Sequence, residues 1–300
     1  GYPNGLQDWI GHPVEWIGRI ISAQDTALNE ASDRKMKGVI VIAVTLGLVT
    51  VITLPLAFWL RTLESGWIAE ALLASTLLSQ KSLEDHVRAV ADGLRQSLAK
   101  GREAGKHIVG RDPAKLDRSG IAKGAVESLA ENMSDGVIAP LFWLLVAGLP
   151  GIALYKAVNT ADSMIGYKSE KYRDFGWAAA RLDDLLNLIP ARLCGWLIAA
   201  AAALLPGLSA KGAITAMARD AGKHVSPNAG WPEAAMAGAI DVTLGGPRRY
   251  DGKGVDLPAM GNGRKKLETA DIDQALRVYN CALNLLTGLI VTACLIIWTA

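Results

Sequence analysis

Long apolar stretches separated by charged segments dominate the pattern of this chain. Uncharged runs cover residues 38–60, 136–155, 193–210 and 278–300, and each is close to the roughly 20 residues that a membrane-spanning helix requires. A fifth stretch, 66–80, carries a single charge at Glu70 and suits either a spanning or an interfacial helix. The pattern predicts an all-α, polytopic integral membrane protein built as a helical bundle.

Basic residues are unevenly distributed between these runs. They are concentrated in residues 19–37, 81–123, 156–192 and 211–277, which we expect to face the cytoplasm. The apolar runs between them must then form hairpins, with turns at 61–66, 148–151 and 205–207, where Gly and Pro interrupt helices. The second and third hairpins have short arms, so re-entrant or half-buried hairpins are expected.

Residues 81–135 differ from their surroundings, because charges alternate with a helical apolar pattern. Leu83, Val87, Val90, Leu94 and Leu98 recur at helical spacing, and a second helix is predicted from Ser119 towards Asp135. We interpret 81–135 as a cytoplasmic helical insertion within a single membrane-embedded domain, 1–300. No strand-like alternation or internal repeat is evident.

Composition narrows the class further. The chain has 51% hydrophobic residues, a mean hydropathy of +0.24 and a net charge of +2, without a compact basic run, so nucleic acid is not an expected partner. Cys194, Cys281 and Cys294 lie in apolar runs and are read as small buried hydrophobes. The chain opens at Gly1 without an initiator Met, and we expect an upstream helix to be missing.

Three carboxylates precede the second apolar run. On a helix, Glu127, Glu131 and Asp135 fall at i, i+4 and i+8 and share a face, where like charges repel unless a cation or basic ligand offsets them. Ionisable groups at a membrane border are functional candidates. The alternative is a solvated amphipathic helix that ends at Gly136.

A second polar segment, 155–168, follows the same run. Tyr155, Asn159, Asp162 and Gly166 share a helical face, with Lys156 beside it, so an ammonium, an amide and a carboxylate meet at the membrane border. Alternatively, Lys156 only extends to the membrane surface and pairs with Asp162.

A third cluster occupies 176–192. Asp184 and Leu188 lie on one line of a helix while Asp183 and Asn187 lie on the next, so neighbouring oxygen ligands point to one sector. Mg²⁺ prefers such oxygens and bridges them to phosphates. The alternative is an amphipathic helix whose acids pair with nearby arginines.

The segment 224–239 is a Pro/Gly loop that enters a helix of small residues. Ser226 or Asn228 is predicted to cap that helix, and Glu233 suits its first turn, which makes an anion site plausible. The turn at 245–250 is basic and glycine-rich. His12, a lone histidine before a helix, is interpreted as structural rather than catalytic.

Taken in order, these segments resemble one family. The motifs His12-Pro13-Val14, Glu131 to Gly136, Tyr155 to Thr160, Asp162-Ser163-Met164, Gly176 to Arg192 and Ser226 to Ala237 look like adenosylcobinamide-phosphate synthase, the CobD/CbiB proteins of cobalamin biosynthesis. The resemblance covers nearly the whole chain. Relatives often carry Gly-Asp-Pro before the His-Pro, whereas this chain reads Gly1-Tyr2-Pro3, with Tyr2 in the place of that acid.

The resemblance implies a multi-pass enzyme of a bacterial or archaeal inner membrane. It would join adenosylcobyric acid to (R)-1-aminopropan-2-ol or its O-phosphate, with ATP and Mg²⁺. Partners would be the lipid bilayer and later membrane enzymes of nucleotide-loop assembly.

The roles assigned to single residues are hypotheses from chemistry. Metal ligands would be Glu131, Asp135, Asp183 and Asp184, with Asn132 assisting. The proton from the attacking amine would go to Asp162. Phosphate and substrate would be bound by Lys156, Asn159, Lys168, Arg181, Ser226, Asn228 and Glu233.

Two rival functions are open. An intramembrane prenyltransferase or CDP-alcohol phosphotransferase needs spaced aspartate motifs, which the residues after Asp135 and Asp184 do not supply. A transporter would bind substrate at a polar midplane site without covalent chemistry, whereas the polar motifs here border the apolar runs.

Overall fold

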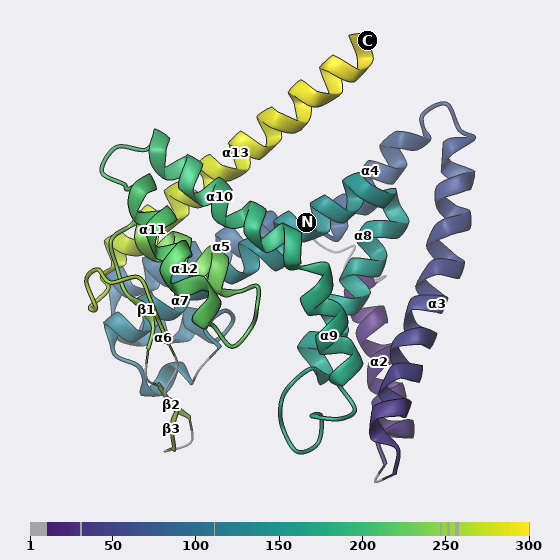
Figure 1. Cartoon of the computed structure of the whole chain (residues 1–300), viewed down its shortest axis with the longest axis horizontal. Helices are drawn as coiled ribbons and strands as arrows, with labels where there is room; N and C mark the ends of the chain where they lie inside the picture. Colours follow the sequence, from purple (N-terminus) through teal and green to yellow (C-terminus); the bar gives the residue numbers. More distant parts are fainter. Residues whose placement is uncertain are drawn as a thin grey trace. The chain divides into compact units, whose positions relative to one another are not determined.

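The structure is a computed structural model that describes residues 11–30, 32–110, 112–246, 248–250, 253–255 and 258–299; the predictions for Gly1-Tyr2-Pro3 and Pro247 lie outside them. Within these ranges it is mostly helical with almost no strand, so the predicted all-α class is confirmed (Figure 1). The chain separates into two compact units. The first comprises the described part of Gly1–Ser79 with Asp135–Asn187, and the second comprises Gln80–Ser134 with the described part of Leu188–Ala300. The single domain with an 81–135 insertion stays a prediction.

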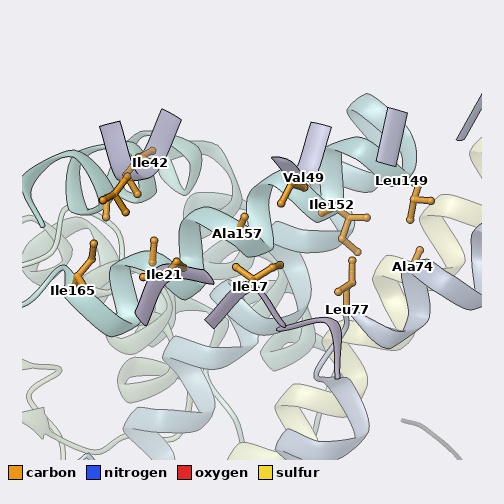
Figure 2. Close-up of a cluster of buried hydrophobic side chains, with 14 of the residues drawn as sticks. Ile17, Ile21, Ile42, Val49, Ala74, Leu77, Leu149, Ile152, Ala157 and Ile165 are labelled. Carbon is orange, nitrogen blue, oxygen red and sulfur yellow. The ribbon is translucent and has the colours of Figure 1, made fainter. Parts of the chain in front are cut away.

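The first unit is built from α2 (Pro13–Leu28), α3 (Arg34–Arg61), α4 (Gly66–Thr76), α8 (Ala139–Ile165) and α9 (Trp177–Leu186). Its helices pack around an apolar core that includes Ile17 and Ile21 of α2, Val49 of α3 and Ile152 of α8 (Figure 2). At the start of α2, His12 and Glu15 form a capping box, and Pro13 occupies the first turn. These signals explain why the helix begins at Pro13.

Three helical stretches of the described chain are long and apolar enough to cross a membrane: α3, the range Arg118–Ile165, and α13 (Thr269–Thr299). A fourth candidate is the pair α9 and α10 (Leu188–Leu204), which passes only as a unit bent by 47°. The run at 66–80 forms α4, which has only 11 residues. Long apolar helices of this kind fit a membrane protein.

The predicted turns lie where the helices are interrupted. The chain turns between α3 and α4, where a Cβ on Gly66 would lie 1.7 Å from the carbonyl oxygen of Leu60, so only glycine fits. Within α8, Ala147 and Gly148 leave helical geometry, with Gly148 at φ 64°, and Glu70 Oε1 accepts the hydrogen bond of the Leu149 N–H at 3.1 Å. The Gly148-Leu149-Pro150 sequence therefore breaks the helix, as expected.

The second unit contains α5 (Gln80–Gln96), α6 (Leu98–Gly105), η1 (Pro113–Lys115), α7 (Arg118–Met133), α10, α11 (Ala210–Asp220), η3 (Ala221–Lys223), α12 (Gly230–Ala239) and α13. The apolar pattern predicted one helix that continues through Leu98, but the observed helix ends earlier, at Gln96. Ser97 is extended and its hydroxyl accepts from the Lys100 N–H at 3.1 Å, so it caps a new helix and α5 stops at Gln96.

Four short strands also lie in the second unit. They form two antiparallel pairs, β1 (Leu244–Gly245) with β4 (Ala259–Met260) and β2 (Arg248–Tyr250) with β3 (Lys253–Val255). None exceeds three residues, which is too short for an alternating pattern to be visible in the sequence.

Candidate functional site

The strongest polar feature of the first unit is a buried lysine. Lys156 on α8 is only 7% exposed, and its Nζ donates to Asn159 Oδ1 at 3.4 Å. The carboxylates whose charges act on it are Asp135 and Asp183. Burying an ammonium without partners costs several kcal/mol, so these acids account for its tolerance inside the protein.

Asp183 on α9 is held by two amides. Its Oδ1 accepts from Asn159 Nδ2 at 3.3 Å, and its Oδ2 accepts from Asn187 Nδ2 at 2.9 Å. Asn187 Nδ2 also lies 3.1 Å from the Asp183 carbonyl oxygen. The carboxylate is therefore fixed in orientation, which a group that must face a ligand or a cation requires.

Tyr155 completes the cluster from α8. Its hydroxyl lies 2.9 Å from Asn187 Oδ1 and 3.1 Å from the Asp135 carbonyl oxygen, both of which accept from it. Tyr155 and Asn187 are fully buried. We name the set Tyr155, Lys156, Asn159, Asp183 and Asn187 the Lys156 cluster.

Sequence reasoning assigned no site role to Tyr155 or Asn187, although it placed both on the relevant helical faces. The available signal was spacing: Asn187 follows Asp183 by four residues and Tyr155 precedes Asn159 by four. The spacing does not show that α8 packs against α9, and it is this packing that brings the two helical faces together.

The acidic line at the end of α7 differs from its prediction. Glu127 is buried and accepts from the Gly245 N–H at 2.7 Å, whereas Glu131 is exposed. A π-helical turn, η2 (Ser134–Ile138), begins before Asp135, so Asp135 does not continue the α-helical spacing of the two glutamates. The regular i, i+4, i+8 spacing predicted for the three carboxylates therefore holds for Glu127 and Glu131 within α7 but is not kept at Asp135. Asn132 is exposed and donates to the Ser128 carbonyl oxygen at 2.9 Å.

No group of three or more His, Cys, Asp or Glu side chains suited to a metal ion occurs among the residues that the structure describes. Asp135 and Asp183 lie near Lys156 instead. The assignment of Glu131, Asp135, Asp183 and Asp184 to Mg²⁺ stays a prediction.

A second set of charged groups lies beside the Lys156 cluster. Asp184 is half-buried, and the charges of Arg181 and Lys168, which are both exposed, act on it. Asp162 is half-buried, and its charge acts on Tyr155. A Cβ on Gly166 would lie 1.9 Å from Asp162 Oδ1, so this glycine leaves room for the carboxylate.

His12 caps the start of α2, which is the structural role that was expected, and the charge of Lys156 acts on the pKa of His12. Its Nδ1 accepts from the Val14 N–H at 3.2 Å, so the ring donates through Nε2 to the Thr76 backbone. Burial lowers the pKa of His12, and the Lys156 charge lowers it further, against the Thr76 hydrogen bond and the Glu15 charge. The capping imidazole is therefore neutral at pH 7.

In the second unit, the loop before α12 differs from its predicted cap. The N-cap residue is Ala229, while Ser226 Oγ accepts from the N–H groups of Asn228 and Ala229 at 3.2 and 3.3 Å. Ser226 therefore stabilises the turn before the helix, and the capping prediction is wrong. Glu233 is buried with Oε1 3.7 Å from His224 Nε2.

Sequence reasoning also missed Asp220, a buried carboxylate of the second unit that accepts four hydrogen bonds. It accepts from Arg219 Nε at 2.9 Å, Arg219 Nη2 at 2.5 Å, Lys223 Nζ at 2.9 Å and the Gly261 N–H at 2.9 Å. These donors outweigh the effect of burial and lower its pKa to about 2. Asp220 therefore joins the end of α11 to the segment that carries β4.

Comparisons with known proteins give one answer. The family model described as CobD/Cbib protein matches residues 2–279. "Cobalamin biosynthesis protein CobD" of Sinorhizobium fredii is 51% identical over 286 residues, covering 93% of this chain and 88% of the relative. The proteins of the same name from Rhizobium meliloti (50% identical, 96% and 90% covered) and Rhodobacter capsulatus (45%, 100% and 94%) agree. No solved structure matches. The chain belongs to the CobD/Cbib family of cobalamin biosynthesis proteins.

Proposed function

We propose that this protein is an ATP-dependent amide ligase of cobalamin biosynthesis. It joins adenosylcobyric acid to (R)-1-aminopropan-2-ol O-phosphate, or to the free amino alcohol, and yields adenosylcobinamide phosphate or adenosylcobinamide. The family supports a role in cobalamin biosynthesis.

The observation that carries the proposal is the buried Lys156, on which the charges of Asp135 and Asp183 act. A carboxylate accepts an amine only after its oxygen becomes a better leaving group, and transfer of a phosphoryl-containing group from ATP supplies that activation. The amine then attacks the acyl carbon, the phosphorylated oxygen leaves, and the amine loses a proton. An ammonium held rigidly in a water-poor site stabilises the negative charge that develops in both steps.

The other residues of the first unit have roles that follow from their exposure. Arg181 and Lys168 are exposed cations beside Asp184 and can bind phosphate oxygens of a substrate that arrives from water. Asp162, half-buried beside Tyr155, accepts the proton of the attacking amine. Ser226, Asn228 and Glu233 in the second unit are proposed to contact the corrinoid or the phosphate of the amine.

The donor set suits magnesium carried by the nucleotide. Mg²⁺ keeps several waters and needs only one or two protein carboxylates, and Asp184 is partly exposed while Asp183 already accepts two amide hydrogen bonds. Asp184 is thus the first candidate ligand, with Asp135 and Glu131 as further ones. The ion would offset charge on the transferred phosphoryl group.

The test is mass spectrometry of detergent-purified protein incubated with adenosylcobyric acid, aminopropanol phosphate, ATP and Mg²⁺, with ATP omitted in a control. An ATP-dependent peak of adenosylcobinamide phosphate is expected. Corrinoid binding without any product would contradict the ligase and favour a carrier.

The role of Lys156 is tested in the same assay. Lys156→Met keeps a long side chain without charge and should lower turnover by at least about a hundredfold, the usual effect of removing a group that stabilises transition-state charge. Lys81→Met is the control, because Lys81 is exposed and its ion pair within the described part of the chain is with Asp85 on its own helix. Near-normal turnover of Lys156→Met would remove Lys156 from the mechanism.

A further inference from the structure

The first unit contains an apolar pocket of about 210 Å³ that the proposed chemistry does not use. It is formed by α2, α3, α8 and the segment from α4 to Leu77. Its buried floor consists of Ile17, Val49, Leu77, Leu149 and Ala153, and Figure 2 shows the first four of these among the labelled side chains of the core. Among the described residues that line it, only Thr53 and Thr76 bring side-chain oxygens to its walls.

The rim of the pocket is exposed. Trp16, Leu48, Ile52 and Leu73 line it and are 44%, 44%, 64% and 40% exposed. Leu48 and Ile52 also belong to the apolar outer surface of α3, which continues through Val44, Val51 and Phe58. The pocket and this outer surface of a candidate spanning helix therefore form one continuous apolar surface.

The position along α3 places the pocket within the hydrocarbon layer. At 1.5 Å per residue, Leu48 and Leu56 lie about 20 and 33 Å from Arg34, and Leu56 lies about 8 Å from Arg61 at the other end. The charged residues at the two ends of α3, Arg34 and Arg61, therefore lie far enough apart to flank a hydrocarbon layer of about 30 Å. At that depth the surrounding medium is lipid acyl chain rather than water.

We infer that this pocket binds the acyl chain of a membrane phospholipid. Its lining offers almost no hydrogen-bonding group, which excludes polar ligands and suits a hydrocarbon. A 150 Å³ apolar cavity holds a six-carbon ring, so about 210 Å³ accommodates a segment of about eight carbons, part of one acyl chain. The exposed rim lets the rest of the lipid remain in the bilayer.

A pair of variants on α3 separates the pocket from the general lipid surface. Thr53→Phe adds a ring into the pocket in place of a methyl group and a hydroxyl, and that hydroxyl donates to the Val49 carbonyl oxygen of the same helix. Val51→Phe introduces the same residue two positions away, at a site that is 72% exposed and outside the pocket. Ala153→Leu fills the pocket from α8 and serves as a second, independent filling variant.

The measurement is native mass spectrometry of delipidated full-length protein titrated with palmitoyl-oleoyl phosphatidylethanolamine. Wild type and Val51→Phe should retain one lipid, while both filling variants should bind it at least about fivefold more weakly. A phospholipid with a diazirine in one acyl chain should label peptides of α2, α3 and α8 in the wild type, which tests the site even if a filling variant fails to fold.

Four results would overturn the inference: no retained lipid in the wild type, equal weakening in Val51→Phe, filling variants that fold and bind lipid normally, or labels that avoid the lining peptides. The discovery of a protein segment cross-linked in the pocket would also overturn it. None of these results bears on the ligase, which is assayed separately.

Discussion

Replacing Asn187 by leucine is the sharpest test of the Lys156 cluster. The two side chains are similar in size, but leucine removes the donor to Asp183 Oδ2 at 2.9 Å, the contact to the Asp183 carbonyl oxygen at 3.1 Å and the acceptor of the Tyr155 hydroxyl at 2.9 Å. Because Asn187 is completely buried, water does not replace these partners.

The magnitude follows from those contacts. A hydrogen bond to a charged group contributes about 1.5–3 kcal/mol and a neutral one about 1 kcal/mol, while the Asp183 carboxylate keeps Asn159 and the Tyr155 hydroxyl keeps the Asp135 carbonyl oxygen. We expect a loss of about 2–4 kcal/mol in the free energy of unfolding. In a chain of 300 residues, that lowers Tm by about 3–6 °C.

The assay is thermal unfolding in detergent, followed by tryptophan fluorescence, with Asn280→Leu as the control. Asn280 is partly buried and makes one side-chain hydrogen bond among those described, to Glu84 Oε1 at 3.2 Å, so its replacement should lower Tm by less. The double variant Asn187→Leu with Tyr155→Phe should lose less than the sum of the single losses, since both remove one shared bond. A Tm of Asn187→Leu within about 2 °C of wild type would refute the reasoning.

Three further predictions concern pH and packing. The pKa of Asp220 is lowered to about 2 in the folded protein, so its ionised carboxylate stabilises the fold by about 2 kcal/mol above pH 4, and this stabilisation is lost as pH falls towards 2. The Tm difference between wild type and Asp220→Asn should therefore shrink between pH 4 and pH 2. The pKa of His12 is lowered in the folded protein, so the unfolded protein binds more protons near pH 6, and stability falls as pH drops below the unfolded value of 6.5. NMR titration should place the His12 pKa below 6.5. His12→Asn keeps a capping side chain and should flatten the pH dependence of Tm between pH 7 and 5. Gly166→Ala brings a Cβ within 1.9 Å of Asp162 Oδ1 and should lower turnover by displacing that carboxylate, whereas Gly47→Ala meets nothing within 4 Å and should leave turnover unchanged; equal turnover of the two variants would contradict a role for Asp162.

Much of the fold follows from local sequence. Apolar runs of about 20 residues fixed the existence of α3 and α13, because a backbone in lipid must satisfy its own hydrogen bonds within a helix. His12 before Pro13 marked the start of α2, and Gly148 with Pro150 marked the break in α8. The order of polar motifs also identified the family, which the comparisons confirm.

Other features depended on contacts between segments distant in the chain. The sequence placed Lys156 and Asp183 on separate helices, and only the packing of α8 against α9 joins them through Asn159 and Asn187. The π turn at Ser134 could not be read from the apolar pattern, because one turn of altered geometry shifts Asp135 without changing hydropathy. Helical spacing determines which residues share a face, but the tertiary structure decides which faces meet, since burial and hydrogen bonding are satisfied only when helices pack.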